Sequence, residues 1–338
     1  MRRQSIAVLS VFLVFTIGVL AQDQPFRIKV DVALVTVDVI AQDLRGQLVS
    51  NLNKADFEVL EDGRPQEIAY FATSETPRNM MLMFDVSGST NEQRPFMVQA
   101  CNVFLSLMRP YDRVSLASFA VNFQMLMNWR TMVEGKPREV TMPAVQIGSQ
   151  VYPSIEDALE RFKAEKGRKG LIVMTDGRDT TFFNDIQASR KIVEPEADKY
   201  FQGIVRNIRK HGVPLYFIAI NTDRNRFPVT NILAGSDIEY TTIEGLMGKA
   251  GAQNYLAAVR TRMERLAEAT GGRILFPRTL DEVAPLYELI AREFDLSYTL
   301  GYAPVNANPD GKPRRIEVKV VSRDFVRVNQ SRDSYIPR

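Results

Sequence analysis

Residues 85–89, Asp-Val-Ser-Gly-Ser, place one carboxylate and two hydroxyls on a short glycine-containing segment. The apolar run at 80–84 directly before it predicts a buried strand, because the run is too short for a helix and ends in a turn. Oxygen ligands of this kind suit a hard divalent cation. Because one carboxylate leaves such a cation short of negative charge, we expect a further anion from elsewhere, either in this chain or in another protein.

A second apolar run, at 171–174, is followed by the acidic loop Thr175-Asp176-Gly177. Strand-like runs alternate with helical spacing from residue 79 onward, which is typical of a parallel sheet with crossover helices. Ligands bind at the carboxyl ends of the strands in such sheets, and both acidic loops belong to that edge. The alternative is that residues 85–89 form only a turn that caps the next helix. We expect Thr90 to act as a helix cap rather than as a ligand.

Residues 85–89 resemble the Asp-x-Ser-x-Ser motif of von Willebrand factor type A domains. In that family, a hydroxyl from a second loop and an Asp after a later strand complete a metal-ion-dependent adhesion site (MIDAS). The distal Thr of the family is a serine here, in the stretch Gly-Ser-Gln-Val-Tyr-Pro at 148–153, and its hydroxyl could still bind the metal or orient a water. The resemblance implies five metal ligands: Asp85, Ser87, Ser89, Ser149 and Asp176.

The resemblance extends over most of the chain. Three further stretches, at 56–63, 269–273 and 298–302, occur in an order similar to that of exported bacterial "VWFA-related" proteins, which are mostly uncharacterised in function. It implies an α/β fold with a doubly wound, mostly parallel, Rossmann-like sheet. It also implies a Mg²⁺ cofactor, or Mn²⁺ or Ca²⁺ in its place.

Both ends of the α/β part are rich in strand patterns. In the first, Asp62-Gly63 predicts a hairpin between strands at 57–60 and 68–71. Neither end is long enough for a core of its own, so we expect the two to pair into a small antiparallel β-sandwich. The predicted organisation is a signal peptide (1–21), an N-terminal β segment (22–76), a von Willebrand factor type A domain (77–295) and a C-terminal β segment (296–338).

The signal peptide is predicted from a basic start, an apolar stretch at 6–20 and small residues before Gln22. The alternative is an uncleaved N-terminal anchor. No later stretch approaches the roughly 20 apolar residues that span a bilayer. We therefore expect an exported protein located in the periplasm, on the outer surface or in the medium.

Composition narrows the classes of partner. The chain has 43 basic and 40 acidic side chains, and two of the basic ones lie in the predicted signal peptide. This near balance argues against nucleic acid or an anionic membrane as the main partner. The only cysteine, Cys101, lies among apolar residues at helical spacing and is predicted to be a core residue, so no intramolecular disulfide is expected.

Catalysis is not favoured. A nucleophilic Ser87 or Ser89 would need an adjacent base, usually histidine. The only histidine, His211, is predicted at a helix end on the opposite edge of the sheet, where it suits the helix dipole. No phosphate-binding loop or His-Glu-x-x-His motif occurs. A hydrolase that uses a metal held by Asp85 and Asp176 is the less favoured alternative.

Two long loops are predicted on the metal-binding edge, at 177–200 and 221–254. Loops of this length are usually functional or disordered, and aromatic residues beside arginine are typical of binding hot spots. Equally, Phe182 and Phe183 could pack their loop onto the sheet. Asp179 could support the metal ligands from behind or act as a helix N-cap, but we expect it to be a surface residue. The candidate partner-binding residues are Arg178, Phe182, Phe183, Arg226 and Phe227.

These observations favour a non-catalytic, metal-dependent protein-binding module of the adhesion type. A partner protein would present an Asp or Glu to complete the coordination of the metal. The rival hypothesis is a structural subunit of a cell-envelope assembly. In that case the β-sandwich makes the contacts and the metal is not required.

Overall fold

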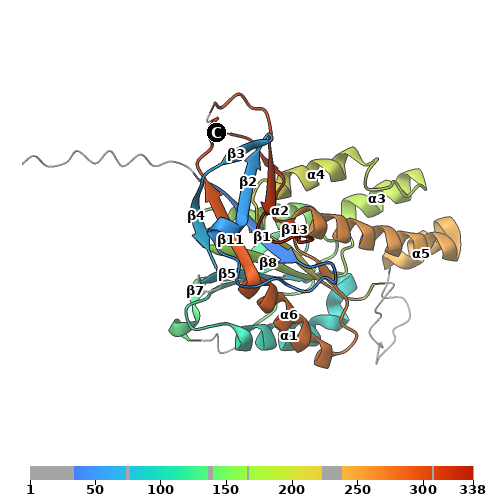
Figure 1. Ribbon diagram of the computed structural model, residues 1–338. Helices are drawn as coiled ribbons and strands as arrows, with labels where there is room; N and C mark the ends of the chain where they lie inside the picture. The colour runs from blue at the N-terminus through green and yellow to red at the C-terminus, as the bar shows by residue number, and fades with distance from the viewer. Residues whose placement is uncertain are drawn as a thin grey trace, which may run out of the picture. The chain divides into compact units, whose positions relative to one another are not determined.

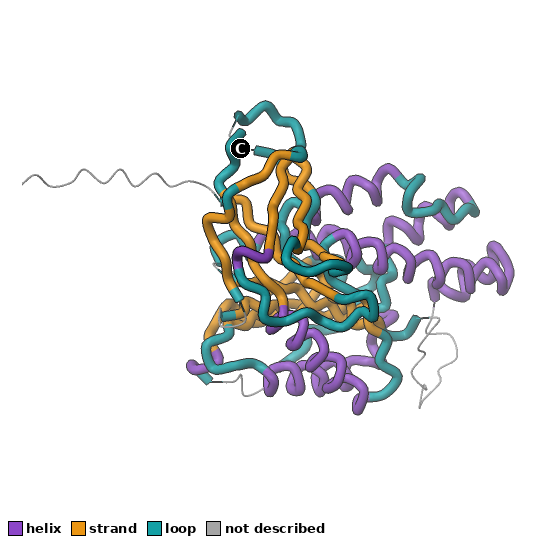
Figure 2. Tube along the Cα trace, viewed as in Figure 1, coloured by secondary structure: helices purple, strands orange, loops and turns teal. Residues whose placement is uncertain are grey.

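The computed structural model describes residues 34–73, 77–135, 140–165, 167–222, 238–306 and 308–337 (Figures 1 and 2). The predicted signal peptide (1–21), Arg226 and Phe227 lie outside the described residues. Among the helices in these ranges, none combines the length and the apolar character needed to cross a membrane.

A six-stranded sheet carries the predicted metal edge. Its strand order is β10-β9-β8-β5-β6-β7, and only the β6–β7 pair is antiparallel. Every residue of β5 is buried, as expected for a parallel strand covered on both faces, which explains its continuous apolar run. The strands are β5 (Arg78–Asp85), β6 (Arg113–Phe119), β7 (Phe123–Thr131), β8 (Arg168–Thr175), β9 (Leu215–Ala219) and β10 (Ile274–Leu275).

Helices cover both faces of this sheet. Met81 and Met83 of β5 join the hydrophobic cluster under α2, α3, α4 and α5, whereas Leu82 and Phe84 join the cluster under α1 and α6. Figure 1 shows α1 and α6 together on one side of the sheet. This arrangement confirms the predicted doubly wound α/β fold. The helices are α1 (Arg94–Leu107), α2 (Val151–Glu160), α3 (Thr180–Ser189), α4 (Lys199–Arg209), α5 (Ile238–Ala269, kinked at Gly248) and α6 (Val283–Leu296), with 3-10 turns at Lys54–Asp56, Gly88–Gln93, Met132–Glu134 and Leu280–Glu282.

Strands from the first and last parts of the described residues pair with each other. β1 is antiparallel to β11, and β2 is antiparallel to β12, within two four-stranded sheets of order β13-β1-β11-β4 and β14-β12-β2-β3. Apolar residues from both sheets, among them Val39, Val59 and Leu300, share one cluster, which forms the predicted sandwich. The strands are β1 (Val35–Gln42), β2 (Phe57–Glu61), β3 (Arg64–Gln66), β4 (Ile68–Ala72), β11 (Ser297–Tyr302), β12 (Arg314–Val320), β13 (Arg327–Gln330) and β14 (Ser334–Tyr335).

Two local predictions are wrong. The hairpin at Asp62-Gly63 joins β2 to β3, whereas β4, the expected return strand, pairs with β11 in the other sheet. The predicted long loops also contain helices, because α3 and the start of α4 fall within 177–200, and residues 238–254, in the described part of the second loop, belong to α5.

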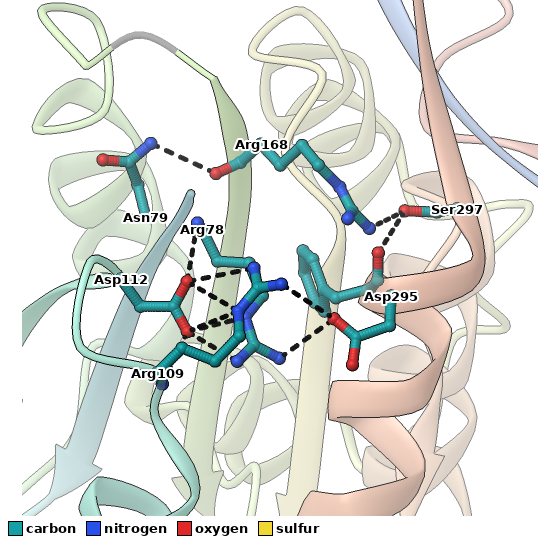
Figure 3. Close-up of polar contacts among 8 residues, drawn as sticks. Arg78, Asn79, Arg109, Asp112, Arg168, Asp295 and Ser297 are labelled. Carbon is teal, nitrogen blue, oxygen red and sulfur yellow. Dashed lines mark hydrogen bonds and ion pairs between the residues drawn. The ribbon is translucent and has the colours of Figure 1, made fainter. Parts of the chain in front are cut away.

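A buried polar network lies at the amino edge of the central sheet (Figure 3). Asp112, just before β6, accepts hydrogen bonds from the backbone N–H of Arg78 (3.0 Å) and from its Nε (2.9 Å). Arg109 donates to the same carboxylate through its backbone N–H (2.9 Å). Both guanidinium groups also lie 3.6 Å from Asp295 of α6. The network therefore joins the starts of two strands to the ends of α1 and α6.

Candidate metal centre

Asp85 is the last residue of β5 and is fully buried. Its Oδ1 accepts a hydrogen bond from the backbone N–H of Ser87 (3.0 Å), and its Oδ2 accepts one from the hydroxyl of Thr175 (2.6 Å). The hydroxyl oxygens of Ser87 and Ser89 lie 3.2 Å apart. The first loop therefore gathers its three predicted ligands. Thr175, the last residue of β8, orients the carboxylate. This role is not evident from the sequence, because the contact joins residues 90 positions apart.

The Thr90 hydroxyl does not cap a helix, contrary to prediction. It donates to the backbone carbonyls of Asp85 (2.8 Å) and Ser87 (3.1 Å), and the N-cap of α1 is Gln93. Thr90 is fully buried and so fixes the backbone of the first loop from within.

Ser149 is held by a reciprocal pair of hydrogen bonds to Thr180. The backbone N–H of Ser149 donates to Thr180 Oγ1 (2.8 Å), and the N–H of Thr180 donates to the Ser149 carbonyl (2.8 Å). A Cβ on the preceding Gly148, whose φ is +89°, would lie 3.1 Å from the same hydroxyl. This clasp joins the second loop to the segment after Asp176. Thr180 was not identified from the sequence, since nothing in its local pattern points across to residue 149.

The hydroxyl oxygen of Ser149 is buried and has no hydrogen-bond partner among the described residues. Leaving a buried hydroxyl unpaired costs about 1–3 kcal/mol. Such an atom fits a ligand position for a cation better than a purely structural role.

Asp176 follows β8 and is buried. Its Oδ1 accepts the backbone N–H of Arg178 (3.1 Å), and its Oδ2 lies 3.4 Å from Arg178 Nε. Burial, and then the negative charge of Asp176, raise the pKa of Asp85 to about 7. Asp176 directly follows Thr175, whose hydroxyl donates to Asp85, so the two carboxylates lie on neighbouring strand ends, and a divalent cation held by both would relieve their repulsion.

The donor set consists of oxygen atoms only. Among the described ranges, no group of three His, Cys, Asp or Glu side chains could hold a metal, so a site here depends on hydroxyls as well as on the two carboxylates. Hydroxyl and carboxylate oxygens suit Mg²⁺, Ca²⁺ or Mn²⁺ rather than softer metals. These residues therefore fit the divalent cation that the motif implies. The assignment of the five individual ligands stays a prediction.

Asp179 is buried, so its expected surface position is wrong. It is the N-cap of α3, where its Oδ1 accepts the backbone N–H groups of Thr181 (2.9 Å) and Phe182 (3.3 Å). Burial raises the pKa of its carboxyl group. The cap starts α3 directly after the acidic loop and so places Thr180 opposite Ser149.

Asp179→Ala is expected to lower the free energy of unfolding by about 1 kcal/mol, because an N-cap carboxylate satisfies backbone donors that alanine leaves unpaired. Urea denaturation measures the change. Asp185→Ala, at an exposed position on the same helix, is the control and should stay within about 0.5 kcal/mol of wild type. Equal stabilities of the two variants would contradict the capping role.

Three of the residues predicted to bind a partner, Arg178, Phe182 and Phe183, lie within the described ranges, and they pack toward the core. Arg178 is buried against Asp176. Phe182 is also buried, with the guanidinium carbon of Arg262 3.9 Å from its ring centroid, and Phe183 is half-buried against the same core. The packing interpretation therefore holds for Phe182, and the inward placement of Arg178 contradicts a surface role.

His211 lies away from the candidate metal site. Its Nε2 is 3.6 Å from Glu160 Oε1, at the end of α2 opposite to Ser149. The predicted position at the other edge of the sheet is confirmed.

Comparisons with known proteins identify similar solved structures. No family model matches the sequence, and no curated protein matches it. A von Willebrand factor type A structure from Catenulispora acidiphila aligns over 91% of this chain and 75% of its own, at 9% identity and a TM-score of 0.44. An aerotolerance-related membrane protein from Bacteroides fragilis aligns over 64% of this chain and 98% of its own, at 12% identity and a TM-score of 0.40.

A third similar structure is proximal thread matrix protein 1 from the mussel byssus, with a zinc-occupied MIDAS motif. It aligns over 68% of this chain, at 13% identity and a TM-score of 0.41, and the match spans 48% of that protein.

Proposed function

We propose that this protein is an exported, non-catalytic binding module of the von Willebrand factor type A kind. In this proposal its five oxygen ligands hold one divalent cation, and an Asp or Glu of a partner protein completes the coordination. The observation that carries the proposal is that two buried carboxylates, Asp85 and Asp176, lie at the carboxyl ends of neighbouring parallel strands, with the Thr175 hydroxyl 2.6 Å from Asp85. Export belongs to the proposal through the pattern of residues 1–21.

The charge balance supports a role in binding. Asp85 and Asp176 carry two negative charges and the three serine ligands add none, but the guanidinium of Arg178 lies 3.4 Å from Asp176, so a bound divalent cation would leave the site with a net positive charge. Mg²⁺ prefers six oxygen ligands and usually keeps several waters. A partner's carboxylate can replace such a water and gain a charge-assisted contact with the cation.

Isothermal titration of the protein with MgCl₂, MnCl₂, CaCl₂ and ZnCl₂ tests the metal-binding step. Saturable binding near one ion per chain is expected for at least one metal, with a matching rise in the melting temperature. The absence of both effects at millimolar metal would contradict the proposal.

Thr180→Val is expected to weaken metal binding about three- to tenfold. The variant loses the hydroxyl that accepts the Ser149 N–H, a net loss of about 1 kcal/mol that leaves Ser149 less well placed. Titration with MnCl₂ measures the change. Thr181→Val, at the next and exposed position, is the control and should bind as wild type does. If the two variants bind Mn²⁺ equally, the clasp does not position the ligand.

The structural-subunit hypothesis has one observation in its favour. Leu44 and Phe325, both largely exposed, line one surface pocket of the β-sandwich. This hypothesis expects partner association to be unchanged by EDTA, whereas the metal-dependent proposal expects it to be lost.

A further inference from the structure

Arg178 is a buried cation beside one of the two candidate carboxylate ligands. It is 1% exposed, and its Nε lies 3.4 Å from Asp176 Oδ2. Its backbone N–H donates to the other carboxylate oxygen of the same residue (3.1 Å). Moving a guanidinium group out of water is costly unless a nearby negative charge offsets the loss of hydration. The chain therefore places a positive charge of its own against a carboxylate that the motif assigns to a metal.

The turn that carries Arg178 is held by helix α5. Gly177 has a φ of +77°, and a Cβ at this position would lie 2.5 Å from the Sδ atom of Met263, which is buried. On the other side of Arg178, helix α3 begins directly after its N-cap, Asp179. The backbone on both sides of Arg178 is therefore fixed by packing, so its guanidinium group can leave Asp176 only by rotation of the side chain.

The charges at this edge of the sheet determine what a metal would meet. Asp85 and Asp176 carry two negative charges, and Arg178 carries one positive charge next to Asp176. A divalent cation bound to both carboxylates is attracted by them and repelled by the guanidinium group. This repulsion is stronger in a buried site than in water, because the local dielectric is lower. Removal of the arginine charge should therefore favour the metal.

We infer that Arg178 is a built-in counter-ion that competes with the metal for Asp176 and so lowers the affinity for the metal. The inference rests on the proposed function, because it needs a divalent cation held by Asp85 and Asp176. In the metal-free protein the guanidinium group stabilises the buried Asp176 carboxylate. When a metal binds, the two cations must share that carboxylate or the arginine must withdraw. Arg178 thus stabilises the metal-free fold and opposes the metal.

Titration of wild type and of three Arg178 variants with MnCl₂ tests the competition. Changing a group that contacts a metal ligand shifts metal affinity by about 10- to 100-fold, and the loss of a positive charge sets the direction of the shift here. Arg178→Gln is expected to bind Mn²⁺ about 10- to 100-fold more tightly than wild type. Arg178→Met, a second neutral variant, should show the same gain and serves if glutamine at this position prevents folding. Arg178→Lys keeps the charge and should bind Mn²⁺ as wild type does.

Thermal melts of the metal-free proteins give a second measurement. Arg178→Gln leaves the Asp176 carboxylate buried without the arginine charge, so its melting temperature should fall below that of wild type. The rise in melting temperature on adding MnCl₂ should be larger than in wild type, because tighter binding stabilises the folded state more. A merely structural role would instead lower the stability of the fold without strengthening metal binding.

Arg262→Gln is the matched control. Arg262 is also 1% exposed, and it pairs with Asp198 at 3.0 Å instead of with a candidate metal ligand. Its variant loses a buried ion pair of the same type and should melt at a lower temperature than wild type. No gain in affinity for Mn²⁺ is expected.

The outcomes separate the two proposals. If wild type binds Mn²⁺ and both neutral Arg178 variants bind it equally or more weakly, this inference is overturned while the metal site stands. An equal gain in Arg262→Gln would also overturn this inference, since the effect would then come from the overall loss of positive charge. If neither wild type nor the Arg178 variants bind Mn²⁺, this inference and the proposed function fail together.

Discussion

Asp85→Asn is expected to lower the affinity for Mn²⁺ and Mg²⁺ by at least about 100-fold. Loss of a residue that merely orients a ligand already costs 10- to 100-fold in metal sites, and this variant removes one of two anionic ligands. The asparagine oxygen can still accept the Ser87 N–H and its amide can donate to Thr175, so the fold should persist.

In the metal-free protein, the same substitution is expected to leave the stability of the fold unchanged or to increase it. The pKa of Asp85 is raised by burial and by Asp176, which means that its charged form destabilises the folded state above the carboxyl's ordinary pKa. A neutral side chain removes that penalty. The metal-free variant is therefore expected to melt at or above the temperature of metal-free wild type, while the rise in melting temperature on adding metal disappears.

Titration calorimetry and thermal melts with and without MnCl₂ measure both effects. Asp157→Asn, at an exposed position on α2, is the control and should behave as wild type does. Metal binding retained in Asp85→Asn would refute the assignment of Asp85 as a ligand.

The central sheet and its acidic edge could be predicted because both depend on continuous sequence. A parallel strand covered on both faces must be apolar throughout, so the runs before Asp85 and Asp176 identify their strands. Once two such strands are parallel neighbours, the loops at their carboxyl ends must share an edge. The position of Ser149 came from the family motif, and the contact that holds it could not be inferred from the spacing.

Helix α3 was missed because its sequence is a weak helix former. It opens with two threonines and two phenylalanines, which have low helix propensity. The helix is instead stabilised by the buried cap of Asp179 and by packing of Phe182 and Ile186, four residues apart, on the core. Arg178 and Asp179 were expected at the surface because their side chains are charged, and the sequence does not show the contacts that bury them.

Strand β3 was missed for a different reason. Its three residues include Pro65, which cannot donate a hydrogen bond to a neighbouring strand and so suggests a turn. β3 lies at the edge of its sheet, where that missing donor is tolerated. The next apolar run, β4, then looked like the return strand, although it belongs to the other sheet.

Asp112→Asn is expected to lower the free energy of unfolding by about 3–5 kcal/mol at neutral pH. Removing one member of a buried ion pair leaves the other charge buried, and here only the partly exposed Asp295, 3.6 Å away, remains as a partner. The charge left behind is that of Arg78, which is 2% exposed and donates to Asp112 through both backbone and side chain. Urea denaturation at pH 7 measures the loss.

The pH dependence and a neighbouring carboxylate make this test specific. Burial alone would raise the pKa of Asp112, but hydrogen bonds from Arg78 and Arg109 outweigh burial and lower it. Its contribution is therefore complete above the unfolded-state pKa of about 3.9 and is lost as the pH falls through the lower folded-state value. Asp112→Asn should therefore lose this part of the pH dependence of stability.

Asp295→Asn is the control. It removes a carboxylate that contacts the same two arginines but whose side chain is 40% exposed, so it should lower the free energy of unfolding by less than about 1 kcal/mol. Equal losses in the two variants would mean that burial of the Arg78–Asp112 pair does not set the stability of this edge.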